Sequence, residues 1–312
     1  MSQAVSLIAT LLNEEQSLPE FLDSVLAQSR APEEVVLVDG GSTDRSCEII
    51  QGYIERGAPI KLLVAPGANR SQGRNIAIRA AHGPIIAASD AGCRLAPDWL
   101  ERIVAPLECG EAQVAAGYYA PQATTLVERA IAAATVPGAD EVNPATFLPS
   151  SRSVAFLQEV WNIVGGYPEN TSEAEDTLFD LALKGAGAKF CFVPQALVYW
   201  RQHERFSKLF WQFYRYAKSD GQAGLLLGHY RKVFLLAGWT VLLVGLALFN
   251  VGRLLAPALL ALTCIGYGLR YLRRSRRRGW DWPAALVSPI AMFVTDVANY
   301  WGFKIGRLGR KL

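Results

Sequence analysis

Residues 35–44 read VVLVDGGSTD, a short apolar run that ends in an acidic, glycine-rich turn. The apolar run predicts a buried strand with Asp39 at its carboxyl end. Ligands of open α/β sheets bind beyond the carboxyl ends of the strands, and glycines there let a backbone approach closely. Asp39 is placed to accept a hydrogen bond from a base N–H or a ribose hydroxyl. The competing interpretation is an ordinary helix-capping turn made by Ser42 or Asp44.

Strand-like and helix-like segments alternate through the first hundred residues. The expected strands are Val5–Leu12, Glu34–Val38, Ile60–Ala65 and Pro84–Ala88, and the expected helices are Ser17–Gln28, Ser46–Arg56, Gln72–Ala81 and Pro97–Leu107. This alternation predicts an α/β fold with a mostly parallel sheet and helices on both faces. No G-x-G-x-x-G follows any of these strands, which disfavours a dinucleotide dehydrogenase.

Composition indicates a membrane rather than nucleic acid as the partner. Of the 312 residues 51% are apolar, which is high for a fully soluble chain. From residue 270 onward ten Lys and Arg face two acids, which leaves 21 basic and 26 acidic residues before that point. A basic tail on a neutral-to-acidic body suits anionic lipid headgroups. The five cysteines form no C-x-x-C pair, so neither a disulfide framework nor a zinc site is indicated.

Two apolar runs in the last third are long enough to enter a bilayer. Val233–Phe249 and Leu254–Leu272 approach the roughly 20 residues that a bilayer core requires, and the short link between them predicts a hairpin. The arginines of residues 273–278 end the second run, and the positive-inside rule places them in the cytoplasm. The first residues do not resemble a signal peptide, so we expect the N-terminal domain in the cytoplasm too. For Pro283–Phe303, which contains an Asp and an Asn, we expect an interfacial or re-entrant helix; a third span is the alternative.

Polar residues follow the other expected strands. Asn13 and Glu14 come after the first strand, and Gly73-Arg74-Asn75 opens a helix, which brings a guanidinium and an amide to the same edge. Asp90-Ala91-Gly92 follows the fourth strand. A carboxylate there suits Mg²⁺ or Mn²⁺ bridging a diphosphate, because these hard cations prefer oxygen ligands.

Three acids crowd a later segment. Glu173, Glu175 and Asp176 precede a short expected helix, Thr177–Lys184, in what we expect to be an irregular loop. Crowded carboxylates tend to raise the pKa of one of them, which a general base at neutral pH requires. The alternative is a solvated helix N-terminus, where the helix dipole favours acids.

In order, these motifs resemble an inverting family 2 glycosyltransferase of the GT-A fold, of the membrane-anchored bacterial type. The resemblance covers roughly residues 4–220 and rests on Asn13-Glu14, the VDGGSTD turn, Gly73-Arg74-Asn75, Asp90-Ala91-Gly92, Gly165-Gly166-Tyr167 and Glu175-Asp176. It implies that Asp39 contacts the nucleotide base, that Asp90 binds the metal and the donor diphosphate, and that Asp176 deprotonates the acceptor hydroxyl. It extends the donor site to Thr10, Asn13, Glu14, Arg74, Asn75 and Ala91.

Two residues depart from the family pattern. The family's turn reads D-D-G-S-T-D where this chain has Gly40, and its D-x-D has become Asp90-Ala91-Gly92, so one expected metal ligand is absent. Donor phosphates and water can complete the shell of a hard cation. We therefore expect weaker metal binding rather than none.

The segment after the acids is similar to the family's Q-x-x-R-W motif at Gln212-Phe213-Tyr214-Arg215-Tyr216. The resemblance implies an interface helix, residues 203–220, that covers the acceptor terminus with Gln212, Arg215, Tyr216 and Glu175. An amphipathic helix without substrate contact is the alternative. We expect a GT-A domain over residues 1–220 and a membrane region over residues 228–312.

The expected function is transfer of a sugar from a nucleoside diphosphate sugar to a lipid-linked or glycan acceptor at the cytoplasmic face of the inner membrane. A polyprenyl-phosphate sugar transferase is the alternative enzyme. A non-catalytic nucleotide-sugar-binding scaffold, suggested by Gly92, is the alternative outside enzymes.

Overall fold

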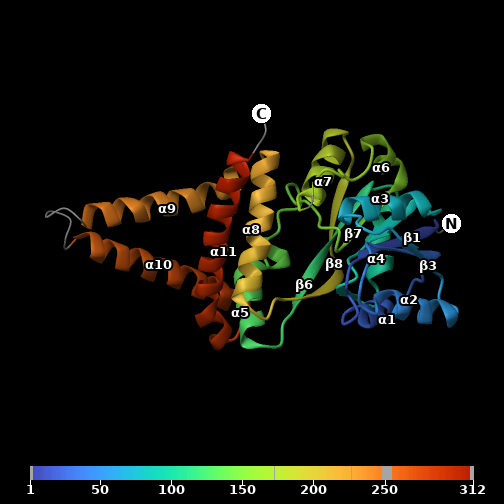
Figure 1. Ribbon diagram of the computed structural model, residues 1–312, viewed down its shortest axis with the longest axis horizontal. Coiled ribbons are helices and arrows are strands. Elements are labelled where there is room, and N and C mark those ends of the chain that lie inside the picture. The colour runs from blue at the N-terminus through green and yellow to red at the C-terminus, as the bar shows by residue number, and fades with distance from the viewer. Residues whose placement is uncertain (1–2, 172, 226, 248–254, 310–312) are drawn as a thin grey trace. The chain divides into compact units, whose positions relative to one another are not determined.

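A computed structural model describes residues 3–171, 173–225, 227–247 and 255–309 (Figure 1). The chain divides into two compact units. Unit 1 consists of Met1–Gln122 and Ala139–Arg201, and unit 2 consists of Ala123–Gly138 and Gln202–Leu312.

Unit 1 is built on one eight-stranded sheet with the order β3-β2-β1-β4-β7-β6-β8-β5. Its strands are β1 (Val5–Leu11), β2 (Glu34–Asp39), β3 (Ile60–Val64), β4 (Ile85–Ala88), β5 (Cys93–Leu95), β6 (Val114–Gln122), β7 (Val154–Leu157) and β8 (Phe190–Arg201). Its helices are α1 (Leu18–Leu26), α2 (Ser46–Glu55), α3 (Arg70–Ala80), α4 (Trp99–Glu108), α6 (Gln158–Val164) and α7 (Glu175–Gly185), with a 3₁₀ turn η1 (Ala139–Glu141). The four expected strands and four expected helices of the first hundred residues are confirmed, with ends within two residues of those expected.

The first four strands of the order run parallel. β1 pairs with β2 so that Leu11 lies opposite Asp39, and with β4 so that Ile8 lies opposite Ala88. The carboxyl ends of these strands therefore meet at one edge. That edge is where the polar turns after β1, β2 and β4 leave the sheet.

The other half of the sheet differs from the mostly parallel arrangement that the sequence predicted. β7 runs antiparallel to both β4 and β6, and β5 runs antiparallel to β8; only β6 and β8 pair in parallel there. Four of the seven pairings are parallel, so the sheet is mixed. The expectation holds for the N-terminal half, where β1, β2 and β3 are each followed by a crossover helix.

The core lies on both faces of the sheet. Successive side chains of a strand point to opposite faces, so the apolar side chains of β1 and β2 are buried on both faces of the sheet. Leu7 faces a cluster with Trp99 of α4, and Ile8 faces a second cluster with Phe156 and Phe179. Both clusters are closed by helices, which fixes the sheet edge on which the site is built.

Unit 2 is helical. It contains α5 (Leu126–Thr135), α8 (Phe206–Ala223), α9 (Leu227–Ala247), α10 (Leu255–Arg277) and α11 (Trp282–Leu308). The expected interface helix, residues 203–220, corresponds to α8 and groups with these helices rather than with the sheet. Nη1 of Arg278 donates to the backbone oxygens of Ala133 and Val136 at 3.1 and 2.7 Å, which places a cation at the carboxyl end of α5.

Glycines let α8 and α11 pack backbone to backbone. A Cβ atom at Gly221 would lie 2.6 Å from the backbone oxygen of Phe303. Cβ atoms at Gly302 and Gly306 would overlap backbone carbonyl groups of α8. A larger residue at any of these positions would push the two helices apart, as in small-residue helix interfaces of membrane proteins.

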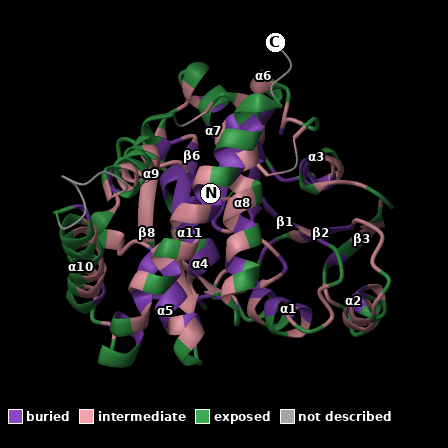
Figure 2. Cartoon of the chain, turned by 60° about the vertical axis from the view of Figure 1, so that its left-hand side comes forward, coloured by how far each residue is buried: buried purple, intermediate pink, exposed green. Residues whose placement is uncertain are grey.

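Among the described residues, α9 and α10 are the helices long and apolar enough to cross a membrane, with 21 and 23 residues. Most of their surface is exposed (Figure 2). The helical character of both expected spans is confirmed over the described residues, whereas the expected link between them lies within 248–254, outside that part. α9 and α10 point away from α8 and α11, whose axes run across theirs (Figure 1). α11 continues without a break through the third apolar run.

Candidate functional site

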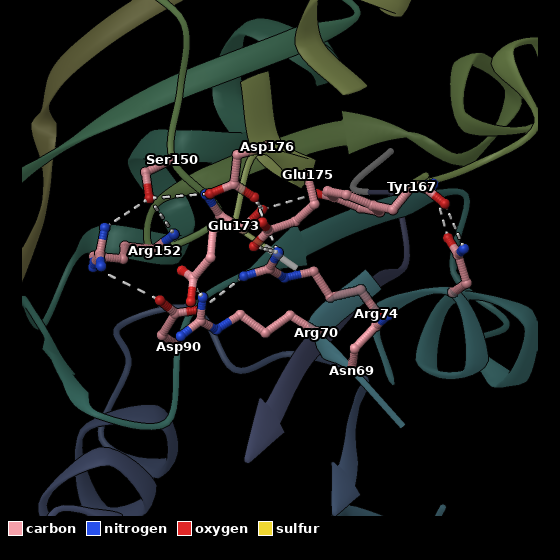
Figure 3. Close-up of polar contacts among 12 residues, drawn as sticks. Asn69, Arg70, Arg74, Asp90, Ser150, Arg152, Tyr167, Glu173, Glu175 and Asp176 are labelled. Atoms are coloured by element: carbon pink, nitrogen blue, oxygen red, sulfur yellow. Dashed lines mark hydrogen bonds and ion pairs between the residues drawn. The ribbon is translucent and has the colours of Figure 1, made fainter. Parts of the chain in front are cut away.

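Arg74 is the centre of a charged cluster at the carboxyl edge of the sheet in unit 1 (Figure 3). It lies near the start of α3, whose first turn is closed by a capping box. Its side chain is 4% exposed, and Nη2 lies 3.1 Å from Oδ1 of Asp90. Nη1 lies 3.1 Å from Oε1 of Glu175 and 3.0 Å from Oδ1 of Asp176. One guanidinium therefore joins the predicted metal ligand to the predicted base.

Gly73 allows Arg74 to reach this position. A Cβ atom at Gly73 would lie 2.7 Å from Cγ2 of Thr10 at the end of β1. Only glycine therefore lets α3 approach β1 this closely. Thr10, which the resemblance assigned to the donor site, turns its methyl group toward α3.

The Asp90 carboxylate is held in its ionised form. It follows β4, and its side chain is 31% exposed. Burial tends to raise its pKa, but the guanidinium groups of Arg74, Arg152 and Arg70 outweigh that effect and hold the pKa below its usual value. Nε of Arg152 lies 3.7 Å from Oδ2, beyond hydrogen-bond distance. A partly exposed, ionised carboxylate with one oxygen only loosely held suits a hard divalent cation.

Glu175 and Asp176 lie in the first turn of α7, not in an irregular loop. The helix begins at Glu175, two residues before the expected start at Thr177. Acids are favoured in a first helical turn by the helix dipole, which was the alternative interpretation of these residues. The same turn delivers Asp176 to the guanidinium of Arg74, and the role of Asp176 as a general base stays a prediction.

Asp176 accepts hydrogen bonds from four donors. Oδ1 accepts from Nη1 of Arg74 at 3.0 Å and from Oγ of Ser151 at 2.6 Å. Oδ2 accepts from the backbone N–H of Ser151 at 3.2 Å and from Oγ of Ser150 at 3.4 Å. The side chain is 27% exposed. Oδ2 has the two longer bonds and is therefore the oxygen that an incoming hydroxyl can most readily approach.

The raised pKa expected from crowded acids is found at Glu175. Its side chain is 5% exposed, and burial and the charge of Asp176 raise its pKa while Arg74 opposes them. Glu173 instead pairs with Arg70 at 2.9 Å. Glu175 and Asp176 thus share Arg74 but differ in exposure, whereas Glu173 pairs with Arg70.

A fourth acid, Asp180, lies one turn further along α7 and is 3% exposed. Burial and the charge of Asp176 raise its pKa well above the usual value, against the opposing charge of Lys184. Its Oδ2 has no hydrogen-bond partner among the described residues. Asp180 could not be selected from the sequence, because an isolated Asp in a helix belongs to no recognisable motif.

Ser150, Ser151 and Arg152, which the sequence analysis did not select, complete the cluster. Nη1 of Arg152 donates to Oγ of Ser150 at 3.1 Å. The guanidinium of Arg152 also lies 4.3 Å from the ring centroid of Trp200 and 5.8 Å from that of Tyr119. The only local signal was a polar run directly before a buried strand. Their partners are distant in sequence.

The Asp39 carboxylate is used within its own turn. Oδ2 accepts from the backbone N–H groups of Gly41 and Ser42, both at 2.9 Å, and Oδ1 accepts from Oγ of Ser42 at 2.5 Å. Asn13, with a φ of 57°, joins this turn by accepting from the backbone N–H of Thr43 at 2.8 Å. The helix-capping alternative is supported at Asp44 rather than at Ser42, because Oδ1 of Asp44 accepts from the backbone N–H of Ser46 at the start of α2 at 3.0 Å. Contact of Asp39 or Asn13 with a nucleotide stays a prediction.

Every hydrogen-bonding group of the Asn75 side chain is used within the protein, so none is left for a nucleotide-sugar donor. Nδ2 donates to the backbone oxygen of Tyr167 and to Oε1 of Glu169, both at 2.8 Å. Oδ1 accepts from the backbone N–H of Tyr167 at 2.9 Å and from Nε1 of Trp161 at 3.2 Å. The residue is 1% exposed. The geometry supports a role in holding the glycine turn before Tyr167, not the predicted donor contact.

Glu14 meets the turn after β4. Ala91 is 1% exposed, so only its backbone is left to contact a donor. A Cβ atom at Gly92 would lie 3.6 Å from Oε2 of Glu14. Burial raises the pKa of the Cys93 thiol to about 12, and the charges of Asp90 and Glu14 contribute. The turns after β1 and β4 thus place two carboxylates near the same buried sulfur.

The predicted acceptor-side residues other than Glu175 lie in unit 2. Gln212 is 8% exposed and donates from Nε2 to the hydroxyl of Tyr216 at 3.2 Å. Arg215 is exposed on the same helix, α8. Their part in acceptor binding stays a prediction.

Comparison with known proteins identifies the sheet-bearing unit. A protein-family model described as "Glycosyl transferase family 2" matches residues 6–146. The chain is 38% identical over 116 residues to an undecaprenyl-phosphate 4-deoxy-4-formamido-L-arabinose transferase of Pseudomonas fluorescens, which covers 35% of this chain and 33% of that protein. It is 28% identical over 183 residues to the uncharacterized glycosyltransferase EpsJ of Bacillus subtilis, which covers 58% and 52%. The chain thus spans a third to a half of the length of these relatives.

Solved structures agree on the fold. The mannosyltransferase PcManGT from Pyrobaculum calidifontis, solved in complex with GDP-Man and Mn²⁺, aligns with a TM-score of 0.70 at 20% identity, over 96% of this chain and 88% of that one. S. aureus TarS 1–349 in complex with UDP aligns with a TM-score of 0.53 at 18% identity, over 98% and 92%. The GT-A fold expected from the ordered motifs is confirmed. Residues 6–146, which include Arg74 and Asp90, are therefore similar to glycosyl transferase family 2, and the sheet-bearing unit has the GT-A fold.

Proposed function

We propose that this protein is a membrane-associated, inverting glycosyltransferase. It transfers a sugar from a nucleoside diphosphate sugar to a lipid-linked or glycan acceptor at the cytoplasmic face of the inner membrane. The observation that carries the proposal is the convergence of Asp90 and Asp176 on the guanidinium of Arg74. A donor-side and an acceptor-side carboxylate are thereby fixed at one edge of the sheet, where ligands of such folds bind.

Asp176 acts as the general base of a single displacement. The acceptor hydroxyl approaches Oδ2, the oxygen with the longer hydrogen bonds, and gives its proton to it as the new bond to the anomeric carbon forms. The bond between the anomeric carbon and the diphosphate oxygen breaks in the same step, which inverts the configuration. Ser151 and Arg74 hold the carboxylate in place throughout.

Asp90 supplies hard oxygen for a divalent cation, Mg²⁺ or Mn²⁺. The fit is supported by its ionised carboxylate, of which Oδ2 lies 3.7 Å from the nearest guanidinium nitrogen of Arg152. A bound cation would offset the negative charge that develops on the departing diphosphate. Arg152 and Arg70 add fixed positive charge near Asp90, since both lower its pKa. PcManGT, solved with Mn²⁺, and GalNAc-T7, solved with UDP and Mn²⁺, have the same fold.

Membrane attachment is assigned to unit 2. α9 and α10 would cross the bilayer as a hairpin with Arg273–Arg277 on the cytoplasmic side. α11 would lie in the interface, because it runs across α9 and α10 (Figure 1). Its surface carries an exposed apolar stripe that includes Trp282, Leu286 and Phe293. Such a stripe on a helix in the membrane plane faces the acyl chains.

The acceptor decides between the two enzyme alternatives. The undecaprenyl-phosphate transferases among the relatives favour a polyprenyl phosphate, and the resemblance of the motifs favours a hydroxyl acceptor. A phosphate is already ionised at neutral pH and needs no general base, whereas a hydroxyl does. Dependence on Asp176 therefore separates the two chemistries.

The test uses the purified full chain in detergent. A panel of nucleotide sugars is screened by thermal stabilisation to find the donor, and sugar transfer is then measured with undecaprenyl phosphate and with hydroxyl-bearing lipid-linked glycans. Asp176→Asn should lower kcat with a hydroxyl acceptor by about 10² to 10⁴ and leave donor affinity nearly unchanged. Glu175→Gln should cost less.

Three results would change the assignment. Full activity of Asp176→Asn with undecaprenyl phosphate would identify a polyprenyl-phosphate transferase. Weaker donor binding with unchanged turnover of the bound donor would make Asp176 a binding residue. Donor binding without turnover of any acceptor would identify a scaffold.

A further inference from the structure

Residue 92, where the family pattern has an acid and this chain has glycine, lies beside another carboxylate in space. Gly92 follows Asp90 by two residues and lacks the acid found in the family pattern. A Cβ atom built there would lie 3.6 Å from Oε2 and 3.8 Å from Oε1 of Glu14. Its three nearest atoms all belong to the Glu14 carboxylate. The space beside residue 92 therefore holds a carboxylate that comes from another strand.

The sheet explains how Glu14 arrives there. β1 and β4 are neighbouring parallel strands with Ile8 opposite Ala88, so the turns that follow them leave the same edge side by side. The turn after β1 is shaped by the left-handed conformation of Asn13, and the backbone N–H of Glu14 donates to Oγ of Ser46 at 2.9 Å. These contacts fix the backbone position of Glu14, from which its side chain extends.

The Glu14 side chain is oriented but not saturated. Oγ of Ser17 donates to Oε2 at 2.5 Å. Among the described residues no cation lies within ion-pair distance of Glu14, in contrast to Asp90, Glu173, Glu175 and Asp176, each of which pairs with an arginine. Oε1 accepts no hydrogen bond and forms no ion pair among the described residues, so it is free to bind a cation.

We propose that Glu14 is the second protein ligand of the divalent cation and takes the place of the acid that residue 92 lacks. The inference rests on the proposed function, which requires a cation at Asp90. Mg²⁺ and Mn²⁺ are commonly held by one or two carboxylates, with diphosphate oxygens and water completing the shell. Absence of a side chain at Gly92 leaves the room that Glu14 needs.

The test measures metal binding rather than activity. Mn²⁺ binding to the full chain in detergent is followed by electron paramagnetic resonance, with Mn²⁺ alone and with UDP or GDP present. Glu14→Gln keeps the shape of the side chain and removes its charge, and should weaken Mn²⁺ in the presence of the nucleotide by about tenfold or more. Asp90→Asn should weaken it at least as much. Glu15→Gln, which removes the same charge one residue away, is the matched control and should change affinity less than about twofold.

Rescue makes the assignment specific. Gly92→Asp in the Glu14→Gln background returns a carboxylate to the same space from β4, and should recover most of the lost affinity. Gly92→Asp alone places two acids in contact, so it should lower the melting temperature without Mn²⁺ and increase the stabilisation that Mn²⁺ provides. If Glu14→Gln does not fold, Glu14→Asp keeps the charge but withdraws it by one methylene, and should weaken Mn²⁺ as well.

Each outcome bears on one claim. Wild-type affinity in Glu14→Gln, combined with loss in Asp90→Asn, would overturn the role of Glu14 and leave the proposed function standing. Failure of Gly92→Asp to rescue would also overturn it. No Mn²⁺ binding by the wild type with either nucleotide would instead refute the metal dependence in the proposed function.

Discussion

Replacing Arg74 with Met tests whether one guanidinium holds the site together. The substitution keeps an unbranched side chain but leaves three carboxylates without their shared cation. Glu175 is 5% exposed, and leaving a buried charge unpaired costs about 3–5 kcal/mol. Asp90 and Asp176 are 31% and 27% exposed, and pairs of that kind add about 0–1 kcal/mol each. We expect a loss of about 3–7 kcal/mol in the free energy of unfolding at neutral pH.

The loss should depend on pH in a defined direction. In the wild type Arg74 lowers the pKa of Asp90, so Asp90 stabilises the folded state above its unfolded value of 3.8. Without Arg74 the folded-state pKa values of Asp90 and Glu175 rise. An acid with a raised folded-state pKa binds its proton more tightly when folded, so stability falls as the pH rises above the unfolded value, which is 4.5 for Glu175. The deficit of Arg74→Met should therefore be small near pH 4.5 and largest at pH 7–8.

Thermal unfolding of the detergent-purified chain, followed by tryptophan fluorescence from pH 5 to pH 8, measures this. We expect the melting temperature to fall by about 10 °C at pH 8 and by much less at pH 5. Arg74→Met/Glu175→Gln should recover most of the loss. Arg70→Met is the control, since Arg70 is 51% exposed and pairs with one acid. An equal loss at both pH values without rescue would mean that packing of Arg74 on Tyr167, not charge, carries the effect.

Three further predictions concern other parts of the chain. Asp180→Asn should raise the melting temperature, by more at pH 8 than at pH 5, because the raised folded-state pKa of this buried acid makes its ionisation destabilising by up to about 1.4 kcal/mol per pH unit; a constant difference would contradict this. Gly302→Leu should lower the melting temperature by separating α8 from α11, whereas Gly238→Leu, where a side chain meets open space, should have little effect. In a background without native cysteines, a cysteine at Arg276 should react only from the cytoplasmic side, and one at Arg310 should do the same if the last helix is interfacial. External labelling at 276 would refute the hairpin, and at 310 it would indicate a third span.

The N-terminal half of the fold was predictable because its signals are local. β1 to β4 are short apolar runs and α1 to α4 have apolar faces of their own, so these elements can be recognised within about ten residues. β6 and β8 give no such signal. β6 contains Gly117 and Pro121, β8 contains Pro194, and their pairing shifts register between Ala116 and Tyr118. Antiparallel pairing of β7 between β4 and β6 depends on contacts between distant segments, which periodicity does not encode.

The candidate site was likewise predictable from the sequence only in part. Asp90 and Arg74 were selected from their positions at strand and helix ends, and they are only 16 residues apart. The contacts that organise the site join residues that lie farther apart in the sequence. Arg74 contacts Glu175 across 101 residues, and Ser151 contacts Asp176 across 25. Asn75 shows the converse case, since a motif position suggested ligand contact and the fold uses the amide internally; its contact with the donor stays a prediction. Sequence order identifies candidates, but the hydrogen-bond partners decide which of them remain available to a ligand.

A single guanidinium shared between donor-side and acceptor-side acids has a consequence for catalysis. Arg74 is buried and cannot lose its proton, because the charges of Asp176 and Asp90 raise its pKa further against the effect of burial. In the proposed mechanism, a cation at Asp90 would compete with Arg74 for that carboxylate, and the guanidinium would then be attracted more strongly to Asp176 and Glu175. Binding at Asp90 would thereby change the electrostatic environment of Asp176. Groups in one such network are not independent, so the effects of changing Asp90 and Asp176 need not add. The separate roles of metal ligand and base therefore describe one coupled cluster with Arg74 at its centre.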